Sequence, residues 1–415
     1  MTKQVVVLGG GTGGTMIANR LRRMLPLEKY RIIVIDRDNR HLYQPGLLFL
    51  PFGMLSAADI VKDRAQHLLP GVDFLEGEVE QVEVIKNRVR LAHVQLVSYD
   101  VLVVASGVRL QPEETQGLTA DGWRRTVFDF YSLEGAAALH EALGTWRGGN
   151  LAINIVDLPI KCPVAPLEFA FLLDWYLQER GLREITTISY VTPLDGAFTK
   201  PVAAKALGQL LDHKHIELVT EFNAGSVDGG AGILRSYDGR EHSFDLLITV
   251  PLHAGPEFVT RSEGLGDEFG FVAVNPKTLQ SEAAPNIFAI GDVASLPTSK
   301  AGSVTHFESE VLGDNILEYL IGKPPSHKYD GHANCFVETG FGKALLIDFN
   351  YDTEPVPGHF PFAFGPLPLL KESRLNHFGK LAFQWFYWNM LLTGRHIPGL
   401  PPQMSRSGKE ITDHA

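Results

Sequence analysis

The chain contains only two cysteines, Cys162 and Cys335. Their wide separation fits neither a Cys-x-x-Cys metal knuckle nor the cysteine-dense framework of a small secreted domain, so we expect no zinc site. A thiolate is the nucleophile of sulfur exchange, and Glu168 follows Cys162 by six residues, where a carboxyl group could carry protons. Taken alone, the cysteines would instead be small buried hydrophobic residues, and Glu168 would only begin a helix.

A second group of residues is suited to binding a nucleotide. Gly9, Gly11 and Gly14 form Gly-x-Gly-x-x-Gly between an apolar run, VVVLGG, and a helical pattern, MIANRLRRML. Such glycines let the backbone approach a pyrophosphate, which the helix N-terminus then faces. Asp36 ends the next apolar run, 22 residues after Gly14, where a carboxylate can bind a ribose. The alternative is a flexible turn, but the strand, helix and Asp36 together predict a dinucleotide site.

The elements that position these residues alternate between strand and helix patterns in two blocks. This alternation predicts an α/β chain with two Rossmann-like domains, which the 415 residues can accommodate. We expect the first domain over 1–112 and 271–325, the second over 113–270, and a third region over 326–415. The net charge of −11, without a basic stripe, argues against nucleic acid as a partner. Neither a secretory signal nor a membrane-spanning apolar run is evident.

Two further segments indicate which nucleotide is bound. The turn VVASG contains Ala105 and Gly107, and the segment IFAIGD contains Gly291 and Asp292. With the glycine turn, they resemble the flavoproteins that have two dinucleotide-binding domains. The resemblance implies FAD in the first domain, with Asp292 binding the ribityl chain. By itself, Asp292 would be an ordinary solvated turn carboxylate.

The second block lacks the glycine turn that NADH-dependent relatives carry. No glycine lies between Leu151 and Phe169, so a pyrophosphate cannot approach the backbone closely there. Cys162 occupies this turn instead. We therefore expect no NAD site in the second domain.

The turn with Cys162 and Glu168, the Lys-x-Gly segment at Lys300 and Gly302, and Cys335 together resemble the sulfide:quinone oxidoreductases. The resemblance implies that the two cysteines face the flavin, form a disulfide or hold a growing sulfur chain, and pass two electrons to FAD. It also implies that Glu168 serves the proton transfers. Sulfide and a membrane quinone would be the substrates.

The sequence departs from this family's best-known members in two ways. The third cysteine that can tether the flavin is absent, so we expect non-covalent FAD. Two segments that often carry a histidine have none, and Trp123, Thr199 or Lys200 are the candidates to fill that space. The proton route and the length of the sulfur product therefore stay open.

The third region contains an amphipathic helix pattern. One predicted stripe carries Leu375, Phe378, Leu381, Ala382, Trp385, Trp388 and Leu392, and another face carries Asn376, Lys380 and Gln384. Such a helix suits a bilayer surface, although a core helix would also give this pattern. Similar tails in the family form a membrane foot with aromatic residues beside the quinone, and Phe341 and Phe383 are our candidates for that role. We expect this tail to be separable from the flavin and sulfur residues, which end by Cys335.

We therefore expect a peripheral membrane enzyme whose membrane face, quinone type and oligomeric state stay open. A flavocytochrome sulfide dehydrogenase flavoprotein is the first alternative, but the missing secretory signal and the aromatic tail count against it. A type II NADH dehydrogenase shares the fold, but the lost glycine turn and Cys162 count against it. A non-catalytic flavin-binding redox sensor is the alternative from another class.

Overall fold

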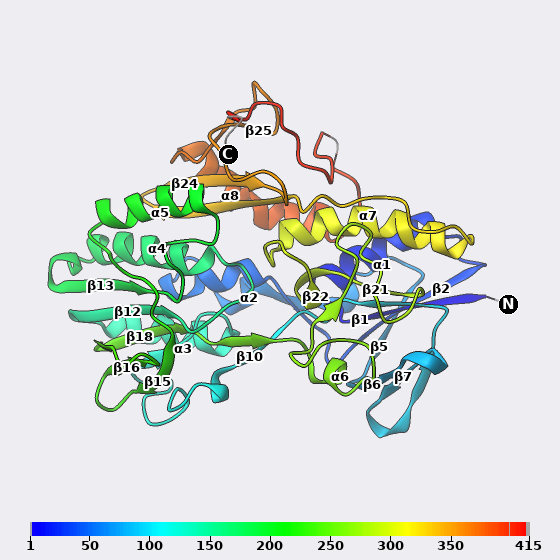
Figure 1. Ribbon diagram of the computed structural model, residues 1–415, viewed down its shortest axis with the longest axis horizontal. Coiled ribbons are helices and arrows are strands. Elements are labelled where there is room, and N and C mark those ends of the chain that lie inside the picture. Colours follow the sequence, from blue (N-terminus) through cyan, green and yellow to red (C-terminus); the bar gives the residue numbers. More distant parts are fainter. Residues whose placement is uncertain (1, 398, 412–415) are drawn as a thin grey trace.

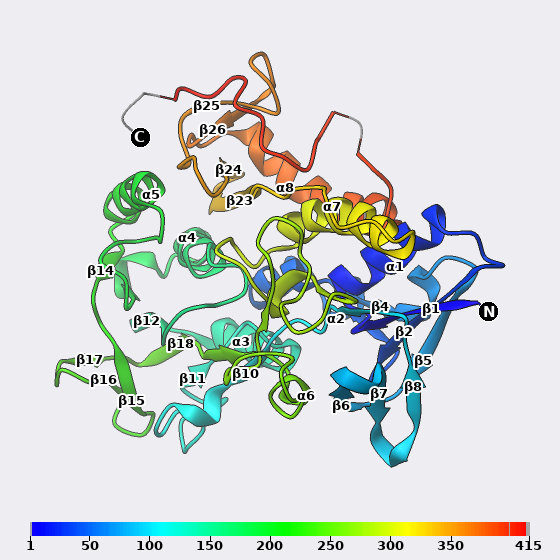
Figure 2. The same cartoon turned by 45° about the vertical axis from the view of Figure 1, so that its right-hand side comes forward.

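The structure, a computed structural model, describes residues 2–397 and 399–411. Its two main sheets lie at opposite ends of the long axis, the first around β1 and β2 and the second around β12 and β13 (Figure 1). The C-terminal elements cover helices of both halves (Figure 2).

The first sheet is parallel, with its strands in the order β21-β9-β1-β2-β5. Because helices cover one face and a small sheet the other, β1 and β9 are continuous apolar runs rather than alternating ones. The elements are β1 (Lys3–Leu8), α1 (Thr12–Met24), β2 (Tyr30–Asp36), β5 (Val72–Glu76), β9 (Val101–Val104), β21 (Ile287–Ala289) and α7 (Gly302–Leu320), with the small sheet β6 (Val79–Glu83), β7 (Arg88–Leu91) and β8 (Leu96–Ser98).

The second sheet is also parallel, in the order β11-β18-β12-β13-β14. Its elements are β11 (Val127–Phe128), α3 (Leu133–Thr145), β12 (Gly149–Ile155), α4 (Ala165–Glu179), β13 (Thr186–Val191), α5 (Pro201–His213), β14 (Glu217–Val219) and β18 (Leu246–Val250), with an antiparallel sheet of β15 (Ala224–Asp228), β16 (Ile233–Ser236) and β17 (Glu241–Ser243). The two-domain α/β fold predicted from the sequence is thus observed.

An antiparallel ribbon of β10 (Arg109–Gln111) and β19 (Leu252–Ala254) joins the domains. The predicted return to the first domain at residue 271 is too late. Helix α6 (Glu257–Thr260) already lies on β6, and the backbone N–H of Val82 donates to Ser262 at 2.7 Å. The reason is burial, because Phe258 and Val259 join the core of the first domain. We place the boundary near residue 255.

The C-terminal region lies across both domains. Strand β23 (Ala333–Gly340) pairs with β24 (Lys343–Phe349) and contacts α4 and α7, while helix α8 (Arg374–Phe386) lies against both strands (Figure 2). A π-helical turn, Tyr387–Leu391, follows α8. The smaller elements are β3 (Arg40–Leu42), α2 (Ala57–Ile60), β4 (Val61–Asp63), β20 (Val272–Ala273), β22 (Ala294–Ser295), β25 (Gly358–Phe360) and β26 (Leu367–Leu369). Within the described residues, no helix is both long and apolar enough to span a membrane.

Candidate functional site

The glycine turn between β1 and α1 is built around close backbone approaches. Gly9 has φ +92°, and a Cβ there would lie 2.6 Å from the carbonyl oxygen of Ala105. A Cβ on Gly14 would lie 1.7 Å from the carbonyl oxygen of Gly9. A Cβ on Gly11 would meet no atom within 4 Å, so this position is open to a ligand. The turn therefore lies beside the Ala105 to Gly107 turn and leaves the start of α1 accessible.

Asp36 lies where a ribose-binding carboxylate is expected, at the end of β2. It accepts a hydrogen bond from the backbone N–H of Gly10 at 2.7 Å and pairs with Arg64, whose side chain is buried. Sequence reasoning missed Arg64, because it belongs to a short 3-10 helix outside any nucleotide motif. A cation thus lies beside the carboxylate that is expected to bind a ribose.

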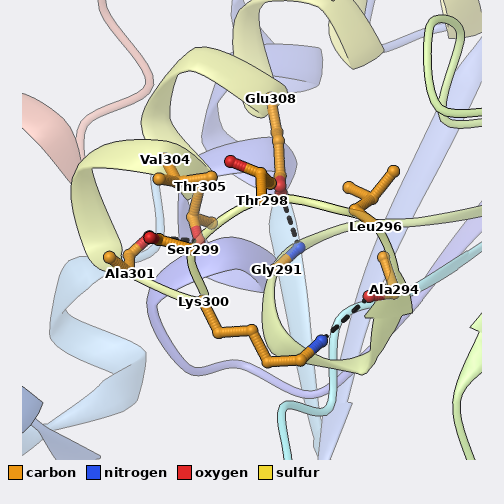
Figure 3. A pocket seen from close by; sticks show the side chains of 10 residues that line it. All are labelled: Gly291, Ala294, Leu296, Thr298, Ser299, Lys300, Ala301, Val304, Thr305 and Glu308. Carbon is orange, nitrogen blue, oxygen red and sulfur yellow. Dashed lines mark hydrogen bonds between the residues drawn. The ribbon is translucent and has the colours of Figure 1, made fainter. Parts of the chain in front are cut away.

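The loop from Gly291 to Ala301 and the start of α7 line a small pocket (Figure 3). The Glu308 carboxylate accepts from the backbone N–H of Gly291 at 2.7 Å, and the Lys300 ammonium donates to the carbonyls of Asp292 and Ala294 at 2.6 and 3.0 Å. Burial raises the pKa of Glu308 to about 7 and raises the pKa of Asp292, which Lys300 opposes.

These features fit a flavin nucleotide. The start of α7 at Gly302 approaches Thr12 of α1. Among the described residues, the half-buried lysines Lys161 and Lys300 have no carboxylate within 4 Å of their ammonium groups. An open glycine turn at a helix start, a carboxylate at Asp292 and two half-buried cations are groups that suit a flavin and its pyrophosphate.

Cys162 lies in the turn between β12 and α4, with a φ of +46° that non-glycine residues rarely adopt. Its backbone N–H donates to the Lys300 carbonyl at 2.6 Å, and its own carbonyl accepts from the Tyr131 hydroxyl at 3.2 Å. The cysteine is therefore fixed directly against the loop that carries Lys300, in the other domain.

Glu168 lies in the first turn of α4 and is fully buried. Its Oε1 accepts from the backbone N–H of Glu338 at 2.8 Å and from the Lys380 ammonium at 2.6 Å. Its Oε2 is buried without a partner among the described residues. Burial raises the pKa of Glu168, while Lys380 opposes this change. Glu168 thus joins α4 to both β23 and α8.

Cys335 lies on β23, a strand that contacts α4. Burial raises the pKa of Cys162 to about 12 and raises the pKa of Cys335 further, partly because Cys162 is near. Lys380 lowers the pKa of both thiols. Lys380 therefore bonds Glu168 directly and acts electrostatically on both predicted cysteines.

Lys380 is the main residue whose role the sequence did not reveal. The pattern placed it on a polar face of the tail helix with Asn376 and Gln384, but that face points inward. Asn376 is fully buried, and His377 on the same helix binds the Glu338 carboxylate at 2.9 Å. In the sequence, Asn376 and Lys380 are one helical turn apart, which indicates that they share a face of the helix. This spacing does not indicate whether that face is buried or exposed.

The predicted apolar stripe divides in two. Leu375, Phe378 and Trp385 are 53%, 62% and 59% exposed, whereas Trp388 and Leu392 are buried. The π-helical turn that starts at Tyr387 redirects the last part of the stripe into the protein. The expectation that the tail is separable from the flavin and sulfur residues is therefore wrong for Lys380 and for Tyr387, whose hydroxyl bonds Thr12 at 2.7 Å.

The two quinone candidates lie in different surroundings. Phe383 is half-buried on α8, 6.5 Å from the Tyr387 ring. Phe341 lies between two glycines at the β23–β24 turn, which projects it toward Lys214 on the second domain, 4.8 Å away. The structure does not bring these two rings into one contact among the described residues.

The candidates for the missing histidines also have other partners. Trp123 packs at the edge of a second-domain core, and the Lys200 ammonium lies 3.4 Å from Glu354. Thr199 precedes the start of α5. Within the part of the chain that the structure describes, no hydrogen bond or ion pair joins these three residues to either cysteine.

The chain was also compared with known proteins. A family model described as pyridine nucleotide-disulphide oxidoreductase matches residues 3–147. The mitochondrial sulfide:quinone oxidoreductase of Mus musculus is 28% identical over 398 residues, covering 94% of this chain and 86% of that protein. The Schizosaccharomyces pombe counterpart is 29% identical over 412 residues, with 93% and 89% covered. The solved sulfide:quinone oxidoreductase of Aquifex aeolicus aligns with a TM-score of 0.81 at 22% identity, covering 95% and 92%. The fold class and the resemblance stated from the sequence are confirmed.

Proposed function

We propose that this chain, a homologue of the sulfide:quinone oxidoreductases, is an FAD-dependent enzyme that oxidises sulfide and reduces a membrane quinone. The observation that carries the proposal is the gathering of Cys162, Cys335 and Glu168 around Lys380. A merely structural role would not require two separate elements to bring the chain's only two cysteines together.

The flavin would be held by the glycine turn, Asp36 with Arg64, and the loop with Asp292 and Lys300. We propose non-covalent FAD, because both cysteines are assigned to sulfur chemistry. When bound, the flavin accepts two electrons from the sulfur site and returns them to a quinone. The ammonium groups of the half-buried Lys161 and Lys300 would favour the more negative, reduced form of the cofactor.

In the oxidised enzyme, we propose that a sulfur–sulfur bond joins Cys162 and Cys335. Hydrosulfide attacks one sulfur, so a new sulfur–sulfur bond forms, the cysteine pair separates, and the other cysteine leaves as a thiolate with the electron pair of the broken bond. Closing a second sulfur–sulfur bond, between this thiolate and the outer sulfur of the new persulfide, releases two electrons and one proton, and the bound flavin would accept the electron pair. The product is sulfane sulfur held between the two cysteines.

Lys380 and Glu168 would manage charge during this exchange. Buried thiols resist ionisation, and the Lys380 ammonium is the cation that lowers the pKa of both. Glu168 keeps this ammonium in place and has one free buried oxygen toward which a proton can move. We propose that Glu168 and Lys380 together stabilise the leaving thiolate and exchange its proton.

The inverted amphipathicity of α8 supports contact with a membrane. In a water-soluble helix the polar face is exposed, but α8 buries Asn376 and Lys380 and exposes Phe378 and Trp385. An aromatic face of this kind suits the bilayer interface. Phe383, half-buried on the same helix, remains our candidate for contact with a quinone ring.

The proposal is tested by an anaerobic titration of the purified flavoprotein. Sulfide should bleach the flavin absorbance, a soluble quinone should restore it, and NADH should do neither. Acid precipitation should release the flavin. Bleaching by NADH would favour a type II dehydrogenase, and no bleaching by sulfide would leave a flavin-binding sensor as the better interpretation.

A further inference from the structure

His253 is a buried histidine with one unused nitrogen, and its ring packs against Tyr131, which holds the Cys162 carbonyl. Its side chain is 8% exposed and lies on β19, in the ribbon that joins the domains. Its Nδ1 lies 2.9 Å from the Pro251 carbonyl oxygen. Because a carbonyl only accepts, Nδ1 must carry the hydrogen, and in the neutral ring Nε2 is then an acceptor. Nε2 is buried and has no partner among the described residues.

Several contacts place this ring beside the sulfur site. The His253 and Tyr131 rings meet edge to face, 5.5 Å apart, and the Tyr131 hydroxyl donates to the Cys162 carbonyl at 3.2 Å. Lys161 donates to the Tyr131 carbonyl at 3.1 Å. His253 also pairs with Leu110, three residues beyond the Gly107 turn of the flavin domain. The imidazole is therefore one side chain away from Cys162, on a strand that pairs with the segment after the Gly107 turn.

The charges around the ring keep it neutral. Burial lowers the pKa of His253 to about 3, and the ammonium groups of Lys161 and Lys300 lower it as well. An acceptor beside two cations is suited to a small anion that also carries a hydrogen. Hydrosulfide has both features, since its charge is attracted by the lysines and its S–H can donate to a bare nitrogen.

We propose that His253 Nε2 binds the S–H group of the incoming sulfide and, with Lys161, orients its sulfur toward Cys162. This inference rests on the proposed function and names a binding residue for it. His253 would also supply a histidine to the sulfur site, although it lies outside the two segments in which the family often carries one.

The test compares His253→Phe and His253→Gln with the unchanged flavoprotein in rapid-mixing measurements of flavin reduction. The Phe variant should need about fivefold more sulfide for half-maximal rate, as one lost hydrogen bond predicts. The Gln variant, which retains an acceptor, should stay within about twofold. Reoxidation by quinone should not change. His306→Gln is the control, because His306 is also buried and its Nε2 makes no hydrogen bond among the described residues, but it lies on α7, 3.6 Å from Glu310.

Each outcome decides between explanations. If the unchanged protein is not reduced by sulfide, the proposed function fails. If it is reduced but both His253 variants match it, only this inference fails. A changed absorbance of the oxidised flavin before sulfide is added would assign Nε2 to the cofactor instead and overturn the proposal. Because the imidazole stays neutral, the effect of His253→Phe should be equal at about pH 6 and about pH 8, and an effect confined to one of them would contradict the acceptor role.

Discussion

The two turns that follow β1 and β12 occupy equivalent places in two similar domains but differ in chemistry. After β1, glycines bring backbone against backbone, and the first turn of α1 has no acidic residue. After β12, the positive φ belongs to Cys162, and the first turn of α4 carries the buried Glu168. The first turn can therefore receive a phosphate, whereas the second would repel one.

The difference shows how one fold can serve two purposes. The helix start that would hold a second nucleotide instead faces β23 and α8, which supply Cys335 and Lys380. The charge at this helix start is therefore balanced within the protein, because Lys380 pairs with Glu168. Variants in either turn, or in α8, should therefore affect flavin binding, sulfur chemistry and membrane binding separately.

Replacing Cys162 or Cys335 with Ala should have the largest effect. Flavin reduction by sulfide should slow by more than about 10³-fold, because either variant removes one half of the sulfur–sulfur bond that hydrosulfide attacks. Flavin content should be unchanged, since the first turn is untouched. Stopped-flow absorbance measures the rate. A variant that kept more than a tenth of the normal rate would make its cysteine a structural residue.

Gly14→Ala should damage the first turn through its backbone. The new Cβ would lie 1.7 Å from the Gly9 carbonyl oxygen, so we expect a loss of about 3 kcal/mol in the free energy of unfolding. Gly11→Ala is the matched control, because its Cβ meets nothing within 4 Å of the protein. That variant should unfold like the normal apoprotein and still bind flavin more weakly. Equal stability of the two variants would contradict the close approach.

The sequence predicted the first turn well because its chemistry is local. Gly9, Gly14 and Asp36 lie in one strand–helix–strand unit. The second turn depends on Lys380, which is 212 residues from Glu168, and no periodicity reports a pairing over that distance. On α8, Leu375, Phe378 and Trp385 are exposed, but the apolar spacing does not indicate the later π-helical turn, which buries Trp388.

Lys380→Met should slow flavin reduction by sulfide, which depends on the second turn, and leave flavin binding at the first turn unchanged. Without the ammonium, the pKa of both thiols should rise. Each rise of one pH unit in a thiol pKa lowers the thiolate fraction at neutral pH by about tenfold, and the rate of flavin reduction should fall in proportion. The rate should recover as pH rises. The double variant with Glu168→Gln removes the unpaired buried carboxylate and should regain stability but not rate. A pH profile identical to that of the normal protein would exclude this role for Lys380.

The smallest expected effect concerns the outer face of α8, whose inner face completes the second turn. Phe378 is 62% exposed, so Phe378→Ser should leave sulfide-dependent flavin reduction unchanged. Because an interfacial side chain is only partly buried in lipid, its loss should weaken binding to liposomes by about tenfold, measured by co-sedimentation. Tyr237→Ser is the control, since Tyr237 is 82% exposed on a hairpin of the second domain. If Tyr237→Ser released the protein equally, or if Phe378→Ser slowed reduction by sulfide, α8 would not divide into a lipid face and a sulfur-site face. The inner face of α8 would then still supply Lys380 to the second turn, but its outer face would have no role in binding lipid.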